Sequence, residues 1–369
     1  MDLTATDEQR ALRDAARELL AARMPPARLA ALADEPAGWE PAIWSELAEL
    51  GWLGVAVPDE LGGAGMGLLE ETILFEETAA VLLPAPFFAT VALTLPALLS
   101  AGAGDLVADV LSGRLRTTFA WADADGDAAL SEAAQTRLEL SARGPDVVVT
   151  GSKAWVPDAD RVEAFVVVAR DDDELALLFV RRDDHGVELR PLTTIDTTRP
   201  LAAVELREAR GRLLARGATA RTAVQAVRDR ALTLAAAEAV GIGQRVLDLA
   251  CDYARERRQF GRAIGTYQAV SHALADVYVQ VELSRSLVVW AALAVDASEP
   301  DADVAVAAAA AKAIPAAVDA CERAIQVHGG IGTTWESPLH RYYKRALSLA
   351  ALDGPPARHR ARVADAVLG

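Results

Sequence analysis

The amino-acid sequence predicts an α+β protein in three parts: an all-helical amino-terminal domain, a middle antiparallel β-sandwich or barrel, and a carboxy-terminal four-helix bundle. Three observations support this prediction. In the first part apolar residues recur at helical spacing, in the middle short β-type runs are separated by Asp, Gly and Pro clusters, and in the last part long Ala-rich segments are joined by short loops. We place the domains at residues 1–115, 116–217 and 218–369.

The amino-terminal domain is predicted to contain helices over 7–24, 44–50, 68–83 and 87–101. Thr6 or Asp7 can cap the first helix, and Pro25 with Pro26 is expected to end it, because proline disrupts a helix interior. A glycine-dense stretch at 57–67, V-P-D-E-L-G-G-A-G-M-G, precedes the third helix. Its composition favours a flexible connector.

The middle domain is predicted from seven short β-type runs, at 117–121, 137–141, 147–150, 164–169, 175–180, 187–191 and 203–206. Their spacing is typical of an antiparallel sandwich or barrel. The glycine fingerprint of a Rossmann fold does not occur among these runs, so a dinucleotide would have to bind in another way.

The carboxy-terminal domain is predicted from helical segments near 219–256, 262–297, 302–328 and 337–352, with a terminal piece from Ala357. Helices of this length, joined by short loops, are what an antiparallel four-helix bundle requires.

Composition and charge exclude several classes of protein. The chain is 52% hydrophobic and 24% charged, as in ordinary globular proteins, and its net charge of -16 argues against a general nucleic-acid binder. Cys251 and Cys321 lie within apolar helical patterns, which indicates neither a disulfide framework nor a metal site. The histidines lack the Cys, Asp or Glu spacing of metal ligands.

The same features indicate a cytoplasmic, reducing location. The amino terminus lacks the basic region and apolar run of a secretory signal. The longest apolar stretch, 305–317, contains Lys312 and Pro315 and is shorter than the roughly 20 residues that a membrane span needs. We therefore expect no membrane span.

Two glycine-bearing stretches interrupt the helical segments. The first, at 255–268, reads R-E-R-R-Q-F-G-R-A-I-G-T-Y-Q, and the second, at 326–338, reads Q-V-H-G-G-I-G-T-T-W-E-S-P. In the first, guanidinium groups can pair with pyrophosphate oxygens, Gly261 and Gly265 allow tight turns, and Phe260 offers an apolar face to a ring. An ordinary helix connector with a solvated basic face would explain the spacing equally well.

Taken together, R-x-Q-F-G-x-x-I-G-x-x-Q and the later Q-V-H-G-G-I-G resemble the acyl-CoA dehydrogenase family of flavoproteins. The resemblance covers essentially the whole chain and is to the short, divergent members that can form mixed tetramers. It implies α,β-dehydrogenation of an acyl-CoA thioester to the 2,3-enoyl-CoA, with FAD as cofactor. It also implies an electron-transfer flavoprotein or similar acceptor, and assembly as a dimer or tetramer, alone or with a paralogous subunit.

The resemblance also implies where FAD binds. Its adenine and pyrophosphate are expected at a subunit interface, where one chain supplies Arg257, Phe260 and Gln268 and its neighbour supplies Gln326, Gly329 and Gly330. All six positions match the family's motif.

In the middle domain the family contacts the flavin ring through an aromatic-x-T-E-P-x-x-G-S run and a W-I-T-N run. Here F-A-W-A-D-A-D-G-D at 119–127 replaces the first, and K-A-W-V-P-D resembles the second. Trp155 thus matches the family tryptophan, while Pro157 stands where a threonine hydroxyl usually bonds the flavin, and proline offers no donor. For Trp155, and for Trp121, flavin contact and a core position both remain open.

Dehydrogenation needs a base over the α carbon, opposite the flavin. Most family members carry a glutamate in a Y-E-G-T run, and Asp353 takes that position in A-L-D-G-P, with a side chain one methylene shorter. Other members carry the base at a position matching Ala231, which cannot serve. Glu238 lies two turns further along the same helix face, where it could act as a base or pair with an arginine. Asp353, Glu238 and no base in this chain all remain open.

We therefore interpret the chain as a dehydrogenase of the acyl-CoA dehydrogenase kind, with a non-catalytic or half-site subunit of a heteromeric dehydrogenase as the alternative. The altered flavin-ring run and the missing glutamate favour this alternative. The two intact glycine-bearing stretches are consistent with cofactor contact in both.

Overall fold

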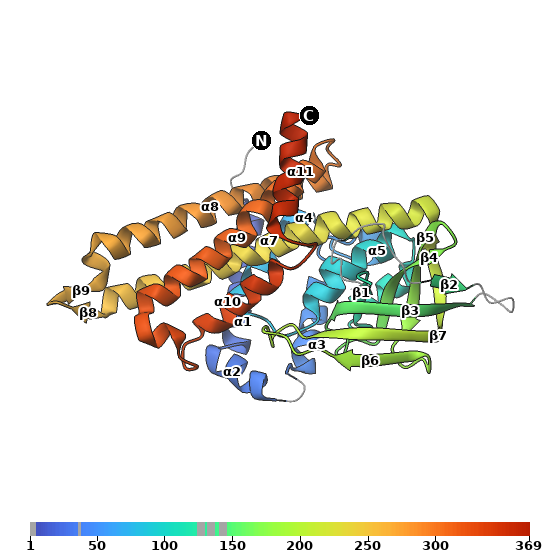
Figure 1. The fold of residues 1–369 in the computed structure, drawn as a ribbon, viewed down its shortest axis with the longest axis horizontal. Helices are drawn as coiled ribbons and strands as arrows, with labels where there is room; N and C mark the ends of the chain where they lie inside the picture. The colour runs from blue at the N-terminus through green and yellow to red at the C-terminus, as the bar shows by residue number, and fades with distance from the viewer. Residues whose placement is uncertain (1–4, 36–37, 124–129, 131–136, 140–145) are drawn as a thin grey trace. The chain divides into compact units, whose positions relative to one another are not determined.

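The computed structural model describes residues 5–35, 38–123, 130, 137–139 and 146–369. They form two compact units, each assembled from separate parts of the chain (Figure 1). The bundle unit contains Met1–Asp34, Gly67–Leu83 and Leu232–Gly369, and the sheet unit contains Glu35–Met66 and Pro84–Ala231. The three-domain boundaries given above remain predictions.

The bundle unit consists mainly of helices. They are α1 (Asp7–Arg23), α2 (Pro26–Asp34), α4 (Leu68–Ala80), α8 (Gln268–Asp296), α9 (Ala302–His328), α10 (Leu339–Leu349) and α11 (Pro356–Leu368). Helix α7 (Gly217–Glu256) begins in the sheet unit and continues into the bundle unit. The long helices α7, α8 and α9 confirm the predicted bundle (Figure 1).

The first predicted helix ends before Pro25 and Pro26, as expected, because α1 stops at Arg23 with Met24 as its C-cap. Pro26 then begins α2, a helix that the sequence analysis did not predict; proline is tolerated in the first turn, where its missing N–H would have no partner within the helix. The segment predicted as a helix over 87–101 starts as π-helix η3 (Phe88–Thr94) and becomes α-helical only in α5 (Leu95–Ser100). Pro96 again lies in the first turn of its α-helix.

The sheet unit combines short helices with seven strands. Its helices also include α3 (Pro41–Glu49), η1 (Trp52–Gly54), η2 (Asp59–Leu61) and α6 (Gly104–Leu111). Its strands are β1 (Thr117–Ala120), β2 (Arg137–Glu139), β3 (Asp146–Pro157), β4 (Ala164–Asp171), β5 (Glu174–Arg181), β6 (Val187–Pro191) and β7 (Leu201–Arg216). All seven predicted runs fall on strands, although residues 140 and 141 of the second run lie outside the described residues.

The strands form one curled sheet in the order β1-β4-β2-β3-β7-β5, with β6 added to β7. Strand β5 pairs with both β7 and β4, so the sheet curls back on itself. The antiparallel prediction holds for most pairs, but β1 and β2 each pair with β4 in parallel. The chain between β1 and β4 contains two other strands and is long enough for a crossover. Alternate residues such as Phe165, Val167 and Leu178 fill the core.

The glycine-dense stretch at 57–67 is not the loose connector that its composition favours. The amides of Ala64, Gly65 and Met66 donate to the carbonyls of residues 54, 57 and 55 at 2.9, 2.9 and 3.0 Å. A Cβ at Gly63 would lie 2.1 Å from the Val57 carbonyl oxygen. Glycine is needed here because two backbone segments lie in close contact, which composition alone does not reveal.

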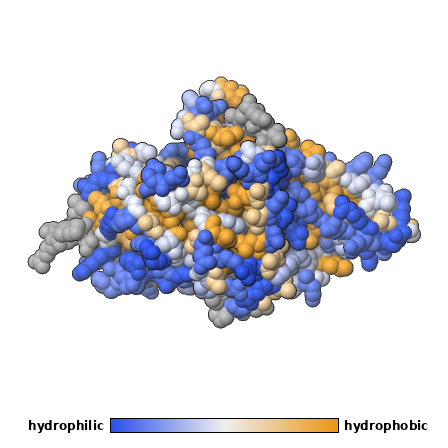
Figure 2. Space-filling view, turned by 180° about the vertical axis from the view of Figure 1, so that it is seen from behind, coloured by the Kyte–Doolittle hydropathy of each residue, from blue (hydrophilic) through white to orange (hydrophobic). Residues whose placement is uncertain are grey.

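Apolar surface reaches the outside of the molecule, as the space-filling view illustrates (Figure 2). On α8 the exposed apolar side chains include Tyr278, Val279 and Leu283. By length and composition, α8 and the segment Ala302–Thr333 could each cross a membrane, so these helices are longer than the apolar stretch considered in the sequence. Core helices of a bundle have the same composition, and α9 is largely buried.

Candidate cofactor and catalytic site

The first glycine-bearing stretch folds as a β-hairpin between α7 and α8. Strands β8 (Arg258–Gln259) and β9 (Arg262–Ala263) pair around a turn of Phe260 and Gly261, and η4 (Ile264–Thr266) leads into α8. Both turn residues have positive φ, 50° and 83°, as a two-residue hairpin turn of this kind requires. Phe260 therefore stands at the tip and is 93% exposed. Its ring is free to contact a ligand or another chain.

The hairpin carries guanidinium groups that the protein itself does not neutralise. Arg257 and Arg258 are exposed, and within the described part of the chain neither forms an ion pair. Arg255, by contrast, lies 2.8 Å from Asp252, and Arg262 stacks over the Tyr267 ring at 3.9 Å. In a chain with a net charge of -16, two unpaired arginines on a turn fit the pyrophosphate of a dinucleotide.

The second stretch follows α9 and forms η5 (Gly329–Thr333). Gly332 is explained by packing, because a Cβ there would lie 2.6 Å from the Ile325 carbonyl oxygen. Gly329 is explained by its φ of 62°. At Gly330 φ is not positive and a Cβ would meet nothing within 4 Å, so the fold does not require glycine. A backbone left open in this way fits the close approach of a ligand or a neighbouring chain.

A ring stack joins the two stretches within one chain. Tyr253 on α7 stacks on His328 at the end of α9, with ring centroids 4.3 Å apart, and His328 Nδ1 lies 2.8 Å from the Ala324 carbonyl oxygen. The hairpin and η5 therefore lie at the same end of the bundle, at the left of Figure 1. Gln326 and Gln268 are both exposed near this end. Sequence reasoning missed Tyr253, although an aromatic residue one turn before the arginines was a visible signal.

An open groove of about 1000 Å³ adjoins the hairpin between α7 and α8. Asp252, Arg255, Gly265, Thr266 and Tyr278 are among the residues that line it. The groove shares Arg255, Ala263, Gly265 and Thr266 with the first glycine-bearing stretch, whereas Arg257, Arg258, Gly329 and Gly330 do not line it.

In the sheet unit, Trp155 is not a core residue. Lys153 and Val156 of β3 pair with Val204 and Ala202 of β7, so the two residues between them form a bulge. Trp155 has a φ of 52° and is 38% exposed, because a bulge turns its side chain away from the alternation of the strand. Trp121, in contrast, is only 8% exposed and lies near Phe119.

A buried ion pair, which sequence reasoning missed, ties the altered flavin-ring run to β3. Lys153 is fully buried, and its Nζ donates to Asp123 Oδ1 at 2.6 Å and to the Trp121 carbonyl at 3.1 Å. The Ala154 amide also donates to the Ala122 carbonyl at 2.8 Å. The part of this run beyond Asp123 lies outside the described residues.

Both candidate bases are buried beside arginines. Asp353 is fully buried in the turn after α10, with a φ of 56°, and its Oδ2 accepts from Arg362 of α11 at 2.8 Å. Glu238 is 3% exposed, and its Oε1 lies 3.8 Å from Nη1 of the equally buried Arg345. The ion pair with Arg362 engages one oxygen of Asp353, and a proton taken up on that oxygen would have to displace the arginine. At the third position, Ala231 is buried and carries no acid.

Comparison with known proteins identifies relatives over nearly the full length. The model of the acyl-CoA dehydrogenase N-terminal domain matches residues 6–114, and that of the acyl-CoA dehydrogenase C-terminal domain matches residues 222–368. Acyl-CoA dehydrogenase IpdE2 of Mycobacterium tuberculosis is 31% identical over 352 residues, which covers 95% of this chain and 94% of the relative.

Solved structures of similar proteins have the same fold. The ChsE4-ChsE5 complex from Mycobacterium tuberculosis superposes with a TM-score of 0.89 at 27% identity, covering 100% of this chain and 99% of the matched chain. A variant of the Tcur3481-Tcur3483 steroid ACAD superposes with a TM-score of 0.86 at 29% identity, covering 98% of both chains. Butyryl-CoA dehydrogenase from Megasphaera elsdenii has the same fold, with a TM-score of 0.90 at 21% identity, covering 100% of both chains.

Proposed function

This chain belongs to the acyl-CoA dehydrogenase family of FAD-dependent oxidoreductases, and from that premise we propose that it is one subunit of a heteromeric dehydrogenase. In this proposal it contributes a half-site for FAD, and a paralogous partner chain contributes the carboxylate base. The reaction is the conversion of an acyl-CoA thioester to the 2,3-enoyl-CoA. The observation that carries the proposal is the fully buried Asp353, held by Arg362 at 2.8 Å.

The reaction explains why a free base is needed. The substrate loses a proton from the α carbon and a hydride from the β carbon, and a double bond forms between them. Bound FAD would supply the hydride acceptor, and an electron-transfer flavoprotein or similar acceptor would take up the electrons. A base must reach the α proton within about 3 Å, and an ion-paired aspartate is short by one methylene and already engaged.

In this proposal the residues of this chain bind FAD and contact neighbouring subunits, and they do not act as the base. Arg257 and Arg258 neutralise the pyrophosphate, and Gly330 with Gln326 lies against the cofactor bound by a neighbouring chain. Phe260 at the hairpin tip and the apolar residues on α8 are covered by neighbouring subunits, as a dimer or tetramer would do.

The similar solved structures support the choice of partner and substrate to test. One of them is a complex of two named components, and another is described as a steroid enzyme. A paralogous chain and a steroid-derived acyl-CoA thioester are accordingly the first partner and substrate to test.

The decisive experiment compares the chain alone with the chain co-expressed with a paralogue. Both are mixed anaerobically with straight-chain and steroid-derived acyl-CoA thioesters while flavin absorbance is followed. We expect bleaching only with the paralogue present, and we expect Asp353→Asn and Glu238→Gln to leave it largely intact. A second candidate, dehydrogenation by this chain alone, rests on the position of Asp353 and predicts the opposite. Bleaching by the chain alone that Asp353→Asn removes would establish it.

Arg257→Ala is expected to weaken FAD binding by about tenfold or more, because a charge-assisted hydrogen bond contributes roughly 1.5–3 kcal/mol. Titration of the apoprotein with FAD measures the dissociation constant. Arg360→Ala is the control, since Arg360 is an exposed arginine of α11 that does not line the groove. Equal losses in the two variants would mean that FAD is attracted only through the overall charge of the protein.

A further inference from the structure

A cavity of about 520 Å³ lies inside the bundle unit, where α1, α4, α7 and α10 meet. Neither the proposed reaction nor the cofactor motifs use it. Its residues include five arginines, which are Arg13, Arg17, Arg245, Arg285 and Arg341. Its carboxylates are Glu76, Glu77 and Asp248.

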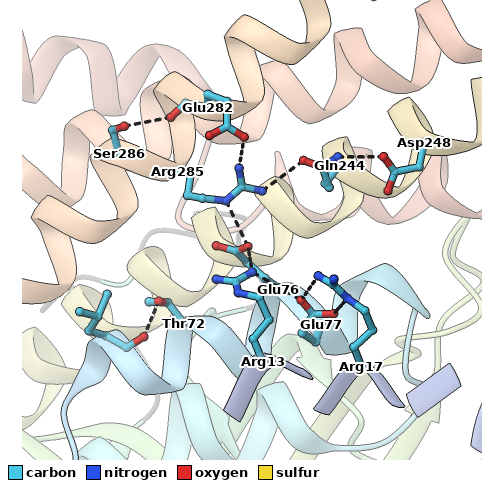
Figure 3. Close-up of polar contacts among 11 residues, drawn as sticks. Arg13, Arg17, Thr72, Glu76, Glu77, Gln244, Asp248, Glu282, Arg285 and Ser286 are labelled. Carbon is cyan, nitrogen blue, oxygen red and sulfur yellow. Dashed lines mark hydrogen bonds and ion pairs between the residues drawn. The ribbon is translucent and has the colours of Figure 1, made fainter. Parts of the chain in front are cut away.

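Three of the five arginines neutralise the two buried glutamates of the cavity floor. Glu76 accepts from Arg13 at 2.8 Å and from Arg285 at 3.3 Å, and Glu77 accepts from Arg17 at 2.8 and 3.1 Å (Figure 3). Arg285 is bound further by Glu282. Glu76 and Glu77 are therefore already neutralised, and Arg245 and Arg341 are not needed to balance their charge.

Arg245 is held in position by groups that carry no charge. It bonds to the hydroxyl of Tyr342, which in turn donates to the Ala80 carbonyl at 2.7 Å. Burial raises the pKa of the Tyr342 hydroxyl, and the Arg245 guanidinium opposes that rise. Within the described residues Arg245 forms no ion pair, although it is half-buried. Its remaining donors are therefore preorganised for an anion.

Arg341 also lacks a carboxylate partner within the described part of the chain, and it too is half-buried. It stands in the first turn of α10, where the helix dipole disfavours a cation. Helix stability therefore does not account for an arginine at this position.

Most of the remaining wall is apolar, apart from Gln244 and Tyr342. Leu20, Met24 and Leu29 are buried residues that line the cavity from α1 and α2, and Val81 lines it from the end of α4. A simple inorganic ion would leave this apolar wall uncovered. A molecule with a charged head and a short apolar part would pair with the two arginines and also cover the apolar wall.

We propose that this cavity binds a small organic anion, whose carboxylate or phosphate head pairs with Arg245 and Arg341 and whose apolar part packs against Leu20, Met24 and Leu29. Guanidinium groups bind both kinds of head through paired N–H donors. Arg341, Leu20, Met24 and Leu29 line this cavity but not the groove beside the hairpin, whereas Arg245 lines both, so the Arg341 variants separate the two sites.

The test is a calorimetric titration of the protein as isolated, with its cofactor and any partner chain. The probes are octanoate and octyl phosphate, with octanamide as the neutral control and inorganic phosphate as the control without a tail. We expect at least one of the two amphipathic anions to bind in the parent protein. Its affinity should fall roughly tenfold in Arg341→Gln and in Arg245→Gln, since each removes a charge-assisted hydrogen bond. Arg360→Gln, an exposed arginine of α11 outside the cavity, should leave the affinity unchanged.

Arg341→Lys keeps the charge and should retain part of the affinity, and melting followed by circular dichroism checks that each variant is folded. If Arg245→Gln unfolds, the Arg341 series alone decides the matter. Failure of both anions to bind would overturn the proposal. So would equal binding of octanamide, inorganic phosphate binding as tight as that of octyl phosphate, or binding that the Arg341 series leaves unchanged.

Discussion

Lys153→Met is expected to lower the free energy of unfolding of the sheet unit by about 3–5 kcal/mol, because it removes the cation from a buried ion pair. The Lys153 side chain is fully buried, and its ammonium lies 2.6 Å from the Asp123 carboxylate, which is 7% exposed. Methionine fills a similar volume, so the loss will come from the charge left on Asp123 and not from a cavity. Denaturant unfolding followed by tryptophan fluorescence measures it.

The double variant Lys153→Met with Asp123→Leu separates this explanation from a general packing defect. Replacing both partners of a buried pair with apolar residues is often close to neutral, so most of the loss should be recovered. Arg182→Met, at an exposed position beyond β5, is the control for adding methionine. A double variant as unstable as the single one would show that the ion pair is not the cause.

Gly241→Ala is expected to destabilise the bundle unit by about 2–3 kcal/mol, because it forces α7 away from α4. A Cβ at this position would lie 2.1 Å from the carbonyl oxygen of Glu76, which is backbone and cannot rotate aside. The displacement would also disturb the Glu76 carboxylate that accepts from Arg13 and Arg285. The midpoint of thermal unfolding should fall accordingly.

Gly243→Ala provides a matched control on the same helix. Its Cβ would lie 3.0 Å from a methyl group of Val281, a side chain that can shift slightly. Alanine is favoured over glycine within a helix by about 1 kcal/mol, so this variant should be neutral or slightly more stable. If Gly241→Ala is as well tolerated as Gly243→Ala, the close approach of α7 and α4 is not a constraint on the fold.

The features that could be predicted from the sequence are those that depend on neighbouring residues, namely helices, strands and short motifs. The periodicity of apolar residues located the long helices of the bundle and all seven strands, but not the short helix α2. The arginine and glycine motifs indicated the hairpin and η5 through their resemblance to a family. These features are contained in consecutive residues, so a single sequence reveals them.

What could not be predicted depends on contacts between distant residues. The pairs Lys153 with Asp123 and Tyr253 with His328 join separate parts of the chain. The parallel pairing of β1 with β4 and the close approach at Gly241 have the same origin. The ion pair at Asp353 is nearer in sequence, but it depends on how the turn before α11 directs Arg362. The local periodicity of apolar residues does not predict such contacts.

The division of the bundle unit among three chain segments has a consequence for biosynthesis. The first segment, Met1–Asp34, leaves the ribosome long before Leu232–Gly369, which completes its unit. Leu20 of α1 is fully buried in the finished protein, so its surroundings are incomplete while the sheet unit is being translated. Until Leu232–Gly369 has been translated, part of the surface that packs on the buried face of α1 is missing, which favours binding of the early segments by chaperones.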